Sequence, residues 1–173
     1  DDVYFAEEAL LSEYVLNPIG IIYTGCVDNI DRKYWYYGQF DSSILDITLD
    51  VLEIAGMSWP QRGSPVTVAR SIAAVVNYQD DRGVLHGKWK GSFSGGVPPT
   101  TWTGSPAILE QYCRTKSTVK YGQCWVFAGV TLTISRALGL PSRCVTNFQS
   151  AHDNDGSITI DIYLDAAGNE RQG

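Results

Sequence analysis

The segment from Gln123 to Leu138 constrains the fold more than any other part of this sequence. Its apolar residues after Cys124 predict a helix, and Gly139 stands where a glycine commonly ends one. The run Trp-Val-Phe-Ala directly behind the cysteine would bury the body of this helix and leave its N-terminal tip exposed. The rest of the chain must therefore supply a surface on which this helix packs.

Other helices are predicted from apolar spacing and from start signals. Two start signals have the same form, a serine N-cap before a proline at the first helical position. These are Ser64-Pro65 and Ser105-Pro106. The predicted segments are Ala6–Leu16, Ser43–Ala55, Ser64–Val76 and Ser105–Cys113.

Strands are predicted mainly in the last part of the chain, at Arg143–Phe148 and Ile158–Leu164, with an earlier strand at Gly20–Gly25 and a turn at Asp165–Asn169. The aromatic run Tyr34–Phe40 is expected to be an irregular loop that covers the core. Asn77–Thr101 is rich in glycine and predicts a long loop, the kind of segment that tends to carry function. Helices first and strands later indicate an α+β fold with a helix packed on an antiparallel sheet. The sheet is expected to be incomplete, because the chain ends soon after its last predicted strands.

Composition narrows the classes of protein. The chain has 173 residues, of which 44% are hydrophobic and 18% charged, as in one globular domain or a piece of a larger one. A net charge of −6 argues against nucleic-acid binding, and the apolar stretches are too short for a membrane span. The acidic N-terminus is not a signal peptide, and without an initiator methionine we expect that the chain does not start at a first codon.

The four cysteines are Cys26, Cys113, Cys124 and Cys144, and they form no C-x-x-C pair. We interpret them as free thiols, which suggests a cytoplasmic protein with a possible extracellular release. A zinc site is not expected, because only two histidines accompany them.

Cys124 has two interpretations on the residues alone. It falls in the first turn of its predicted helix, where unpaired N–H groups and the positive end of the helix dipole favour a thiolate and an oxyanion. It could equally be a small buried core residue. A cysteine nucleophile needs a histidine base, and His86 and His152 are each better interpreted as structural histidines. The residues alone thus give a nucleophile without a convincing base.

The segment Tyr121–Gly129 (Tyr-Gly-Gln-Cys-Trp-Val-Phe-Ala-Gly) resembles the active-site motif of animal calcium-dependent transglutaminases, the coagulation-factor and epidermal members most of all. Further family landmarks follow in family order over essentially the whole chain. They are Glu13-Tyr-Val-Leu-Asn17, Tyr37-Gly-Gln-Phe40, Gly83-Val-Leu85, Trp102-Thr-Gly-Ser105, Arg143-Cys-Val-Thr-Asn147 and Ser150-Ala-His-Asp153.

This resemblance implies a papain-like, cysteine-protease-type core in which Cys124 is the nucleophile. The family's catalytic histidine and aspartate are expected beyond Gly173, so residues 1–173 would form part of a transglutaminase catalytic core that is incomplete on its C-terminal side. The second part of the core, an N-terminal β-sandwich and C-terminal β-barrels would lie outside the chain.

Trp89 follows a glycine and a lysine in the predicted long loop. Packing is the ordinary role of a tryptophan, although its N–H is a pure donor that could support an oxyanion. The resemblance implies that Trp89 stabilises the tetrahedral intermediate and walls the substrate tunnel. Trp102 and Trp125 also fall on landmarks, and we interpret them mainly as packing residues.

Asp153–Asp161 places oxygen-bearing side chains at every second position, a pattern that can gather ligands for calcium. It is not an EF-hand loop, because Gly156 stands at the fourth position rather than the sixth. The alternative is a solvated loop that enters a strand. The resemblance implies a calcium site made of Asp153, Asp155, Ser157 and Thr159, with a further acidic ligand beyond Gly173.

A second calcium site is implied where the helix over Ser64–Val76 ends. The orphan carbonyls of a helix C-terminus are potential oxygen ligands, although the segment could also be an ordinary helix end with solvated aspartates. By resemblance the ligands are the carbonyls of Ala74 and Gln79 together with Asn77 and Asp81.

The activity that the resemblance implies is calcium-dependent acyl transfer from a protein glutamine to a lysine or a small primary amine through a Cys thioester. The partners would be proteins with reactive glutamine and lysine residues, and water in place of the amine would give deamidation. The isolated chain is expected to be inactive without its base. The alternatives are a structural paralogue without catalysis, which the presence of Cys124 disfavours, and a cysteine peptidase, which Trp89 and the calcium loops disfavour.

Overall fold

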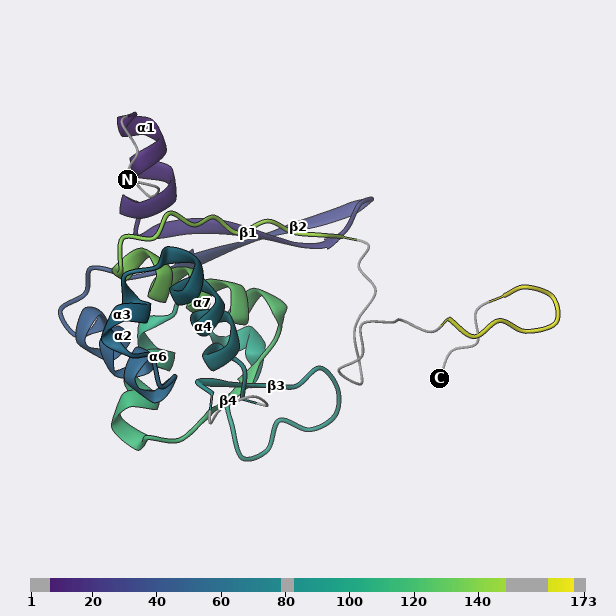
Figure 1. The fold of residues 1–173 in the computed structure, drawn as a ribbon. Helices are drawn as coiled ribbons and strands as arrows, with labels where there is room; N and C mark the ends of the chain where they lie inside the picture. Colours follow the sequence, from purple (N-terminus) through teal and green to yellow (C-terminus); the bar gives the residue numbers. More distant parts are fainter. Residues whose placement is uncertain (1–6, 79–82, 149–161, 170–173) are drawn as a thin grey trace.

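The structure is a computed structural model that describes residues 7–78, 83–148 and 162–169 (Figure 1). In chain order its elements are α1 (Glu8–Leu11), the π-helix η1 (Ser12–Leu16), β1 (Ile19–Cys26), β2 (Asn29–Tyr36), α2 (Ile44–Ile54), α3 (Trp59–Arg62), α4 (Pro65–Val76), β3 (Leu85–Gly87), the 3-10 helix η2 (Pro99–Thr101), α6 (Pro106–Thr115), β4 (Val119–Gly122) and α7 (Cys124–Ala137).

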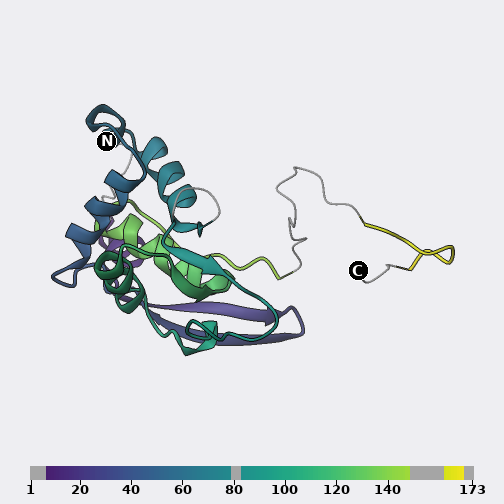
Figure 2. The ribbon, with the colours of Figure 1, turned by 90° about the horizontal axis from the view of Figure 1, so that it is seen from below.

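Helix α7 is the centre of the fold. It packs against α2 and α4 on one side, and the antiparallel hairpin of β1 and β2 covers the opposite side (Figures 1 and 2). The predicted α+β class and the packing of this helix on an antiparallel sheet are thus confirmed. No helix within the described ranges combines the length and the apolar character that crossing a bilayer requires.

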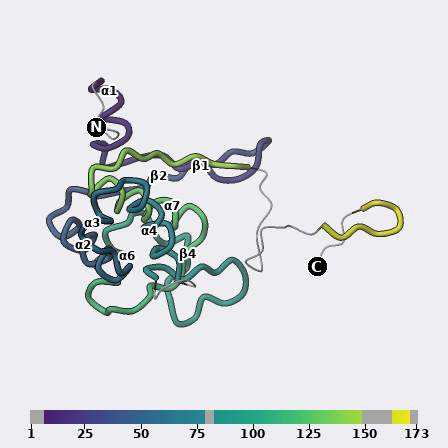
Figure 3. Tube along the Cα trace, in the orientation of Figure 1, coloured from purple at the N-terminus to yellow at the C-terminus, as the bar shows by residue number. Residues whose placement is uncertain are grey.

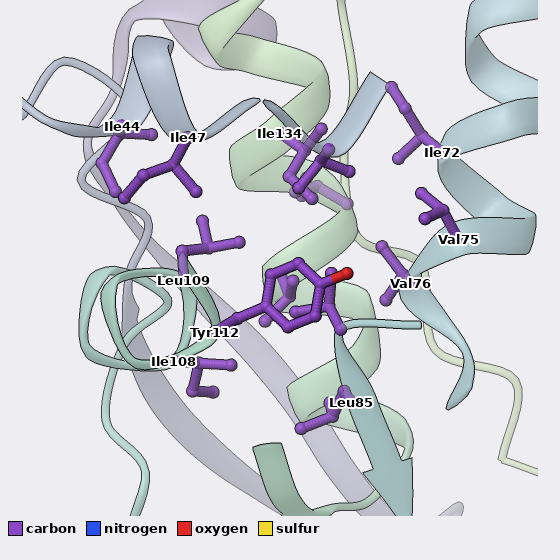
Figure 4. Packing of buried hydrophobic residues seen from close by; sticks show 14 of the residues in the cluster. Ile44, Ile47, Ile72, Val75, Val76, Leu85, Ile108, Leu109, Tyr112 and Ile134 are labelled. Carbon is purple, nitrogen blue, oxygen red and sulfur yellow. The ribbon is translucent and has the colours of Figure 1, made fainter. Parts of the chain in front are cut away.

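The core lies between the helices. Fully buried aliphatic side chains from five elements meet there around Tyr112 (Figure 4). They include Ile44 of α2, Ile72 of α4, Leu85 of β3, Leu109 of α6 and Ile134 of α7. Because β3 enters this cluster, the core also fixes where the segment after β3 begins.

The helix boundaries follow the signals in the sequence. The Ser64 hydroxyl accepts the N–H of Thr67 at 3.4 Å, and Pro65 is the first helical residue of α4. Helix α7 ends before Gly139, which has a φ of +76°, the left-handed conformation that glycine commonly adopts just after a helix C-terminus.

The aromatic run was wrongly predicted to be irregular throughout, because Tyr34–Tyr36 are part of β2. Trp35 is 1% exposed while Tyr34 and Tyr36 are 74% and 40% exposed, which is the alternation of a strand with one buried face. Since Tyr34, Trp35 and Tyr36 are all aromatic, the residue types concealed this alternation. The residues after Tyr36 are irregular, as predicted.

The predicted strand Arg143–Phe148 is also wrong, because the chain there carries no regular secondary structure. This segment lies beside β1, and the side-chain hydroxyl of Thr146 donates a hydrogen bond to the carbonyl of Tyr23 at 2.6 Å (Figure 3). A strand needs repeated backbone pairing, and this contact supplies none.

The turn at Asp165–Asn169 is confirmed, since the N–H of Asp165 donates to the Asn169 carbonyl at 2.8 Å. Of the predicted strand Ile158–Leu164, residues 158–161 lie outside the described residues, and residues 162–163 carry no regular secondary structure. The long predicted loop contains β3, which pairs in parallel with β4, and neither short strand was anticipated.

Candidate active site

Cys124 is the first residue of α7, and its side chain is exposed. Gln123 before it is extended, with φ −130° and ψ 177°, and its carbonyl accepts the first helical bonds from Val126 and Phe127. The N–H of Cys124 is therefore one of the first-turn donors that the helix itself leaves unsatisfied. The predicted helix start is confirmed, and the thiol lies at the tip of the helix rather than in the core.

The approach of the chain to Cys124 depends on Gly122, the last residue of β4. A Cβ atom on Gly122 would lie 2.4 Å from a methyl carbon of Leu85, which is fully buried in the core. The indole N–H of Trp102 donates to the carbonyl of Tyr121 at 2.9 Å and also holds this strand. These contacts fix the point at which α7 begins.

Trp89 lies close to α7, although it is distant in sequence. Its ring is parallel to that of Phe127, with 6.4 Å between centroids and 2° between planes. Gly87 leaves room for this ring, because a Cβ there would lie 2.6 Å from two of its carbons. Trp89 is 56% exposed, and within the described residues its indole N–H has no hydrogen-bond partner. The structure thus places a free indole donor on the segment that flanks the start of α7.

Two main-chain groups fasten that segment to the residues before Cys124. The N–H of Lys88 donates to the carbonyl of Gly122 at 3.0 Å, and the Gln123 side-chain amide donates to the Lys88 carbonyl at 3.1 Å. Gln123 was not singled out from the sequence. The signal in the sequence was its residue type, because glutamine is unusual at a helix N-cap, where Ser, Thr, Asp or Asn is preferred.

On the other side of Cys124 lies a cavity of about 330 Å³. Its walls are Trp125 and Ala128 of α7, residues 22–25 of β1 and residues 144–148. The Cys144 thiol is half-buried there, and burial raises the pKa of this thiol; the electrostatic interaction with the neighbouring Cys124 raises it further. Two thiols thus face one cavity, and Cys124 is the exposed one.

His86 is packed within an aromatic stack. Its ring is parallel to that of Tyr78 at 4.8 Å and meets that of Tyr121 edge-on at 5.4 Å. This is the packing expected of a structural histidine. His152 lies outside the described residues.

The structure describes only part of one of the two predicted calcium sites. Ala74 is in the last turn of α4, and its carbonyl accepts the N–H of Asn77, the C-cap residue, at 3.1 Å. A helix C-terminus of this kind offers oxygen atoms and the negative end of the helix dipole, which suits a hard cation such as Ca²⁺. Within the described ranges, no three Asp, Glu, His or Cys side chains gather in a way that could hold a metal. The remaining predicted ligands, Gln79, Asp81, Asp153, Asp155, Ser157 and Thr159, lie outside those ranges.

Comparisons with known proteins agree on one family. Residues 93–169 match the model of the transglutaminase-like superfamily. Human protein-glutamine gamma-glutamyltransferase K is 53% identical over 95% of this chain, and the human coagulation factor XIII A chain is 50% identical over 98%. The crystal structure of red sea bream transglutaminase superposes on 99% of this chain with a TM-score of 0.87 and 44% identity. The chain spans 20%, 23% and 27% of the lengths of these three proteins.

Proposed function

The chain belongs to the transglutaminase-like superfamily, and on that premise we propose that it carries the nucleophile of a protein-glutamine γ-glutamyltransferase. One observation carries this proposal. The exposed thiol of Cys124 stands at the start of α7, beside a segment that offers the unpaired indole donor of Trp89. A nucleophile next to unoccupied N–H donors is the arrangement that acyl transfer requires.

In the first half of the reaction, the Cys124 thiolate attacks the carbonyl carbon of a glutamine γ-carboxamide. The oxygen of the tetrahedral intermediate accepts hydrogen bonds from the Cys124 backbone N–H and the Trp89 indole N–H. The carbon–nitrogen bond then breaks, the nitrogen takes up a proton and ammonia leaves. The product is a thioester on Cys124.

In the second half, the amine of a lysine side chain attacks the thioester carbon. The carbon–sulfur bond breaks, the thiolate is restored and an isopeptide bond joins the two proteins. Water in place of the amine gives glutamate and so deamidates the substrate. The proton transfers need a general base, and we propose that it lies in the protein outside this chain. His86 is packed between two tyrosines and does not supply it.

Calcium has a place in this proposal as a structural ion. Ala74 and Asn77, with Gln79 and Asp81, would hold one ion where α4 ends, and Asp153, Asp155, Ser157 and Thr159 would hold another. The ion would supply positive charge that fixes oxygen ligands. The backbone bridge between Asn77 and Leu85 joins the end of α4 to β3. These ligands are therefore connected to the segment after β3, which carries Trp89.

The test is calcium-dependent incorporation of a fluorescent primary amine into a glutamine-donor protein by the full-length enzyme. Cys124→Ala is expected to abolish incorporation. Cys26→Ala is the matched control, because Cys26 is also exposed but ends β1 at the tip of the hairpin. Incorporation that survives Cys124→Ala would contradict the proposed function.

A further inference from the structure

Gln123 occupies the N-cap position of α7, yet its side chain makes no capping hydrogen bond. A residue at this position normally turns its side chain back to accept an N–H of the first turn. Gln123 instead reaches across to the segment after β3, where its amide donates to the carbonyl of Lys88 at 3.1 Å. The side chain directly before the nucleophile is therefore engaged with a different part of the chain.

Lys88 is held at every polar group. Its N–H donates to Gly122, its carbonyl accepts from Gln123, and its ammonium group donates to the carbonyl of Ser92. The ammonium also lies 4.8 Å from the centre of the Tyr121 ring. Lys88 is thus a fixed point between β4 and the segment that carries Trp89.

Trp89, the next residue, has no hydrogen bond of its own within the described residues, and its side chain is more than half exposed. Its position therefore depends on two contacts, the stack on Phe127 and the Gln123–Lys88 bond. The stack fixes the plane of the ring. The bond fixes the peptide between Lys88 and Trp89, because a carbonyl and the N–H that follows it lie in one rigid plane.

We propose that Gln123 is the positioning residue for the Trp89 indole: its side-chain amide, by holding the Lys88 carbonyl, directs the indole N–H toward the oxyanion that forms at Cys124. This inference rests on the proposed function. An oxyanion donor has to lie about 2.7–3.1 Å from the oxygen it serves, and a displacement near 1 Å costs about 10²-fold in rate. One hydrogen bond that sets this distance therefore affects the rate through the geometry of the oxyanion site.

The experiment uses full-length protein and the amine-incorporation assay. Gln123→Met keeps the length of the side chain and removes both amide donors, and Gln123→Glu is a second variant of the same length that also cannot donate. For both we expect kcat to fall about 10- to 100-fold with KM for the glutamine substrate little changed. Gln111→Met on α6 is the control for loss of a glutamine elsewhere and is expected to leave kcat unchanged.

A double-mutant cycle with Trp89→Phe separates positioning from a merely structural role. Phenylalanine keeps a ring beside Phe127 but has no N–H to position, so Gln123→Met is expected to cause no further loss in that background. Alkylation of Cys124 by iodoacetamide, a reaction that needs no oxyanion donor, is expected to proceed at the wild-type rate in Gln123→Met.

Each outcome decides a specific point. Wild-type kcat in both Gln123 variants, or a loss that multiplies with that of Trp89→Phe, overturns the inference and leaves the proposed function standing. A slowed alkylation of Cys124 also overturns it, because the defect would then lie in the thiol or the fold. If the wild-type protein incorporates no amine, the proposed function fails and the inference fails with it.

Discussion

The two sides of Cys124 are built by different means. On the Trp89 side, formed by residues 85–89, 119–123 and Phe127, backbone and side-chain hydrogen bonds hold each segment to the next. On the hairpin side, formed by β1, β2 and residues 143–148, there are cavities of about 330 and 670 Å³ and several exposed apolar side chains. Among those side chains, Ile19 is 57% exposed, Ile30 50% and Val145 78%.

This difference separates two tasks. On the Trp89 side, hydrogen bonds between described residues hold the segment that carries Trp89, the donor of the proposed function. The hairpin side is attached to the core by only its inner face and leaves the approach to the thiol open. Substitutions on the Trp89 side should therefore lower the rate, and substitutions on the hairpin side should lower the free energy of unfolding.

The largest expected effect comes from the attachment of the hairpin to α7. Trp35 is 1% exposed, its indole N–H donates to the Ser105 hydroxyl at 2.8 Å, and its ring lies where a Cβ on Gly129 would stand. Trp35→Ala should lower the free energy of unfolding by about 3–5 kcal/mol through the cavity it leaves. Urea unfolding of the full-length protein measures this, and a loss below about 1 kcal/mol would show that the hairpin is not anchored here.

The next effect tests the Trp89 side. Trp89→Phe keeps the stack on Phe127 and removes the indole N–H, so kcat for amine incorporation should fall about 10²- to 10³-fold while the unfolding free energy stays nearly constant. Trp59→Phe is the matched control, because Trp59 is 78% exposed on α3 and distant in the chain from the site. An equal loss in both variants would contradict a specific role for Trp89.

A smaller effect is expected from pH on the hairpin side. Burial raises the pKa of Cys144 and of Tyr37, so both groups stay protonated in the folded protein at pH values where the unfolded chain ionises. Their contribution to stability is complete below about pH 8.5 and is lost as the pH rises through the folded pKa values. The free energy of unfolding should therefore decline in alkaline solution, and Cys144→Ser should reduce the slope near pH 9. A slope that is unchanged by Cys144→Ser would contradict this assignment.

The smallest effect concerns the outer face of the hairpin. Tyr34 is 74% exposed on β2, next to the buried Trp35. Tyr34→Thr keeps a residue that favours strands, and it should change the unfolding free energy by no more than about 0.5 kcal/mol. A larger loss would mean that the outer face of the hairpin stabilises this chain directly.

Much of the helical part could be predicted from the sequence because its signals are local. The Ser64 N-cap, the prolines at the first helical position and Gly139 act within one turn, so α4, α6 and α7 begin or end within about two residues of where they were expected. The predicted cap at Ser105 is wrong, because its hydroxyl accepts the Trp35 indole N–H and makes no capping bond. The same local reasoning placed Cys124 at the tip of its helix.

The strands were harder to predict because a strand is specified by the segment it pairs with, which can be distant in the sequence. β3 and β4 are short and pair with each other across a long separation, and nothing in either segment alone specifies that pairing. Tyr34–Tyr36 concealed its strand because burial, not residue type, alternates along it. For the same reason the Gln123–Lys88 bond could not be predicted, since it joins residues that only the fold brings together.

The central claim is that Cys124 forms the thioester, and its most direct test is to trap that intermediate. Full-length protein with calcium is mixed with a glutamine-donor peptide, without any amine, then quenched in acid and digested for mass spectrometry. We predict an adduct equal to the peptide less ammonia on the fragment that contains Cys124, and none on the fragments with Cys26, Cys113 or Cys144. An adduct on another cysteine, or none at all from protein that incorporates amine, would contradict the account.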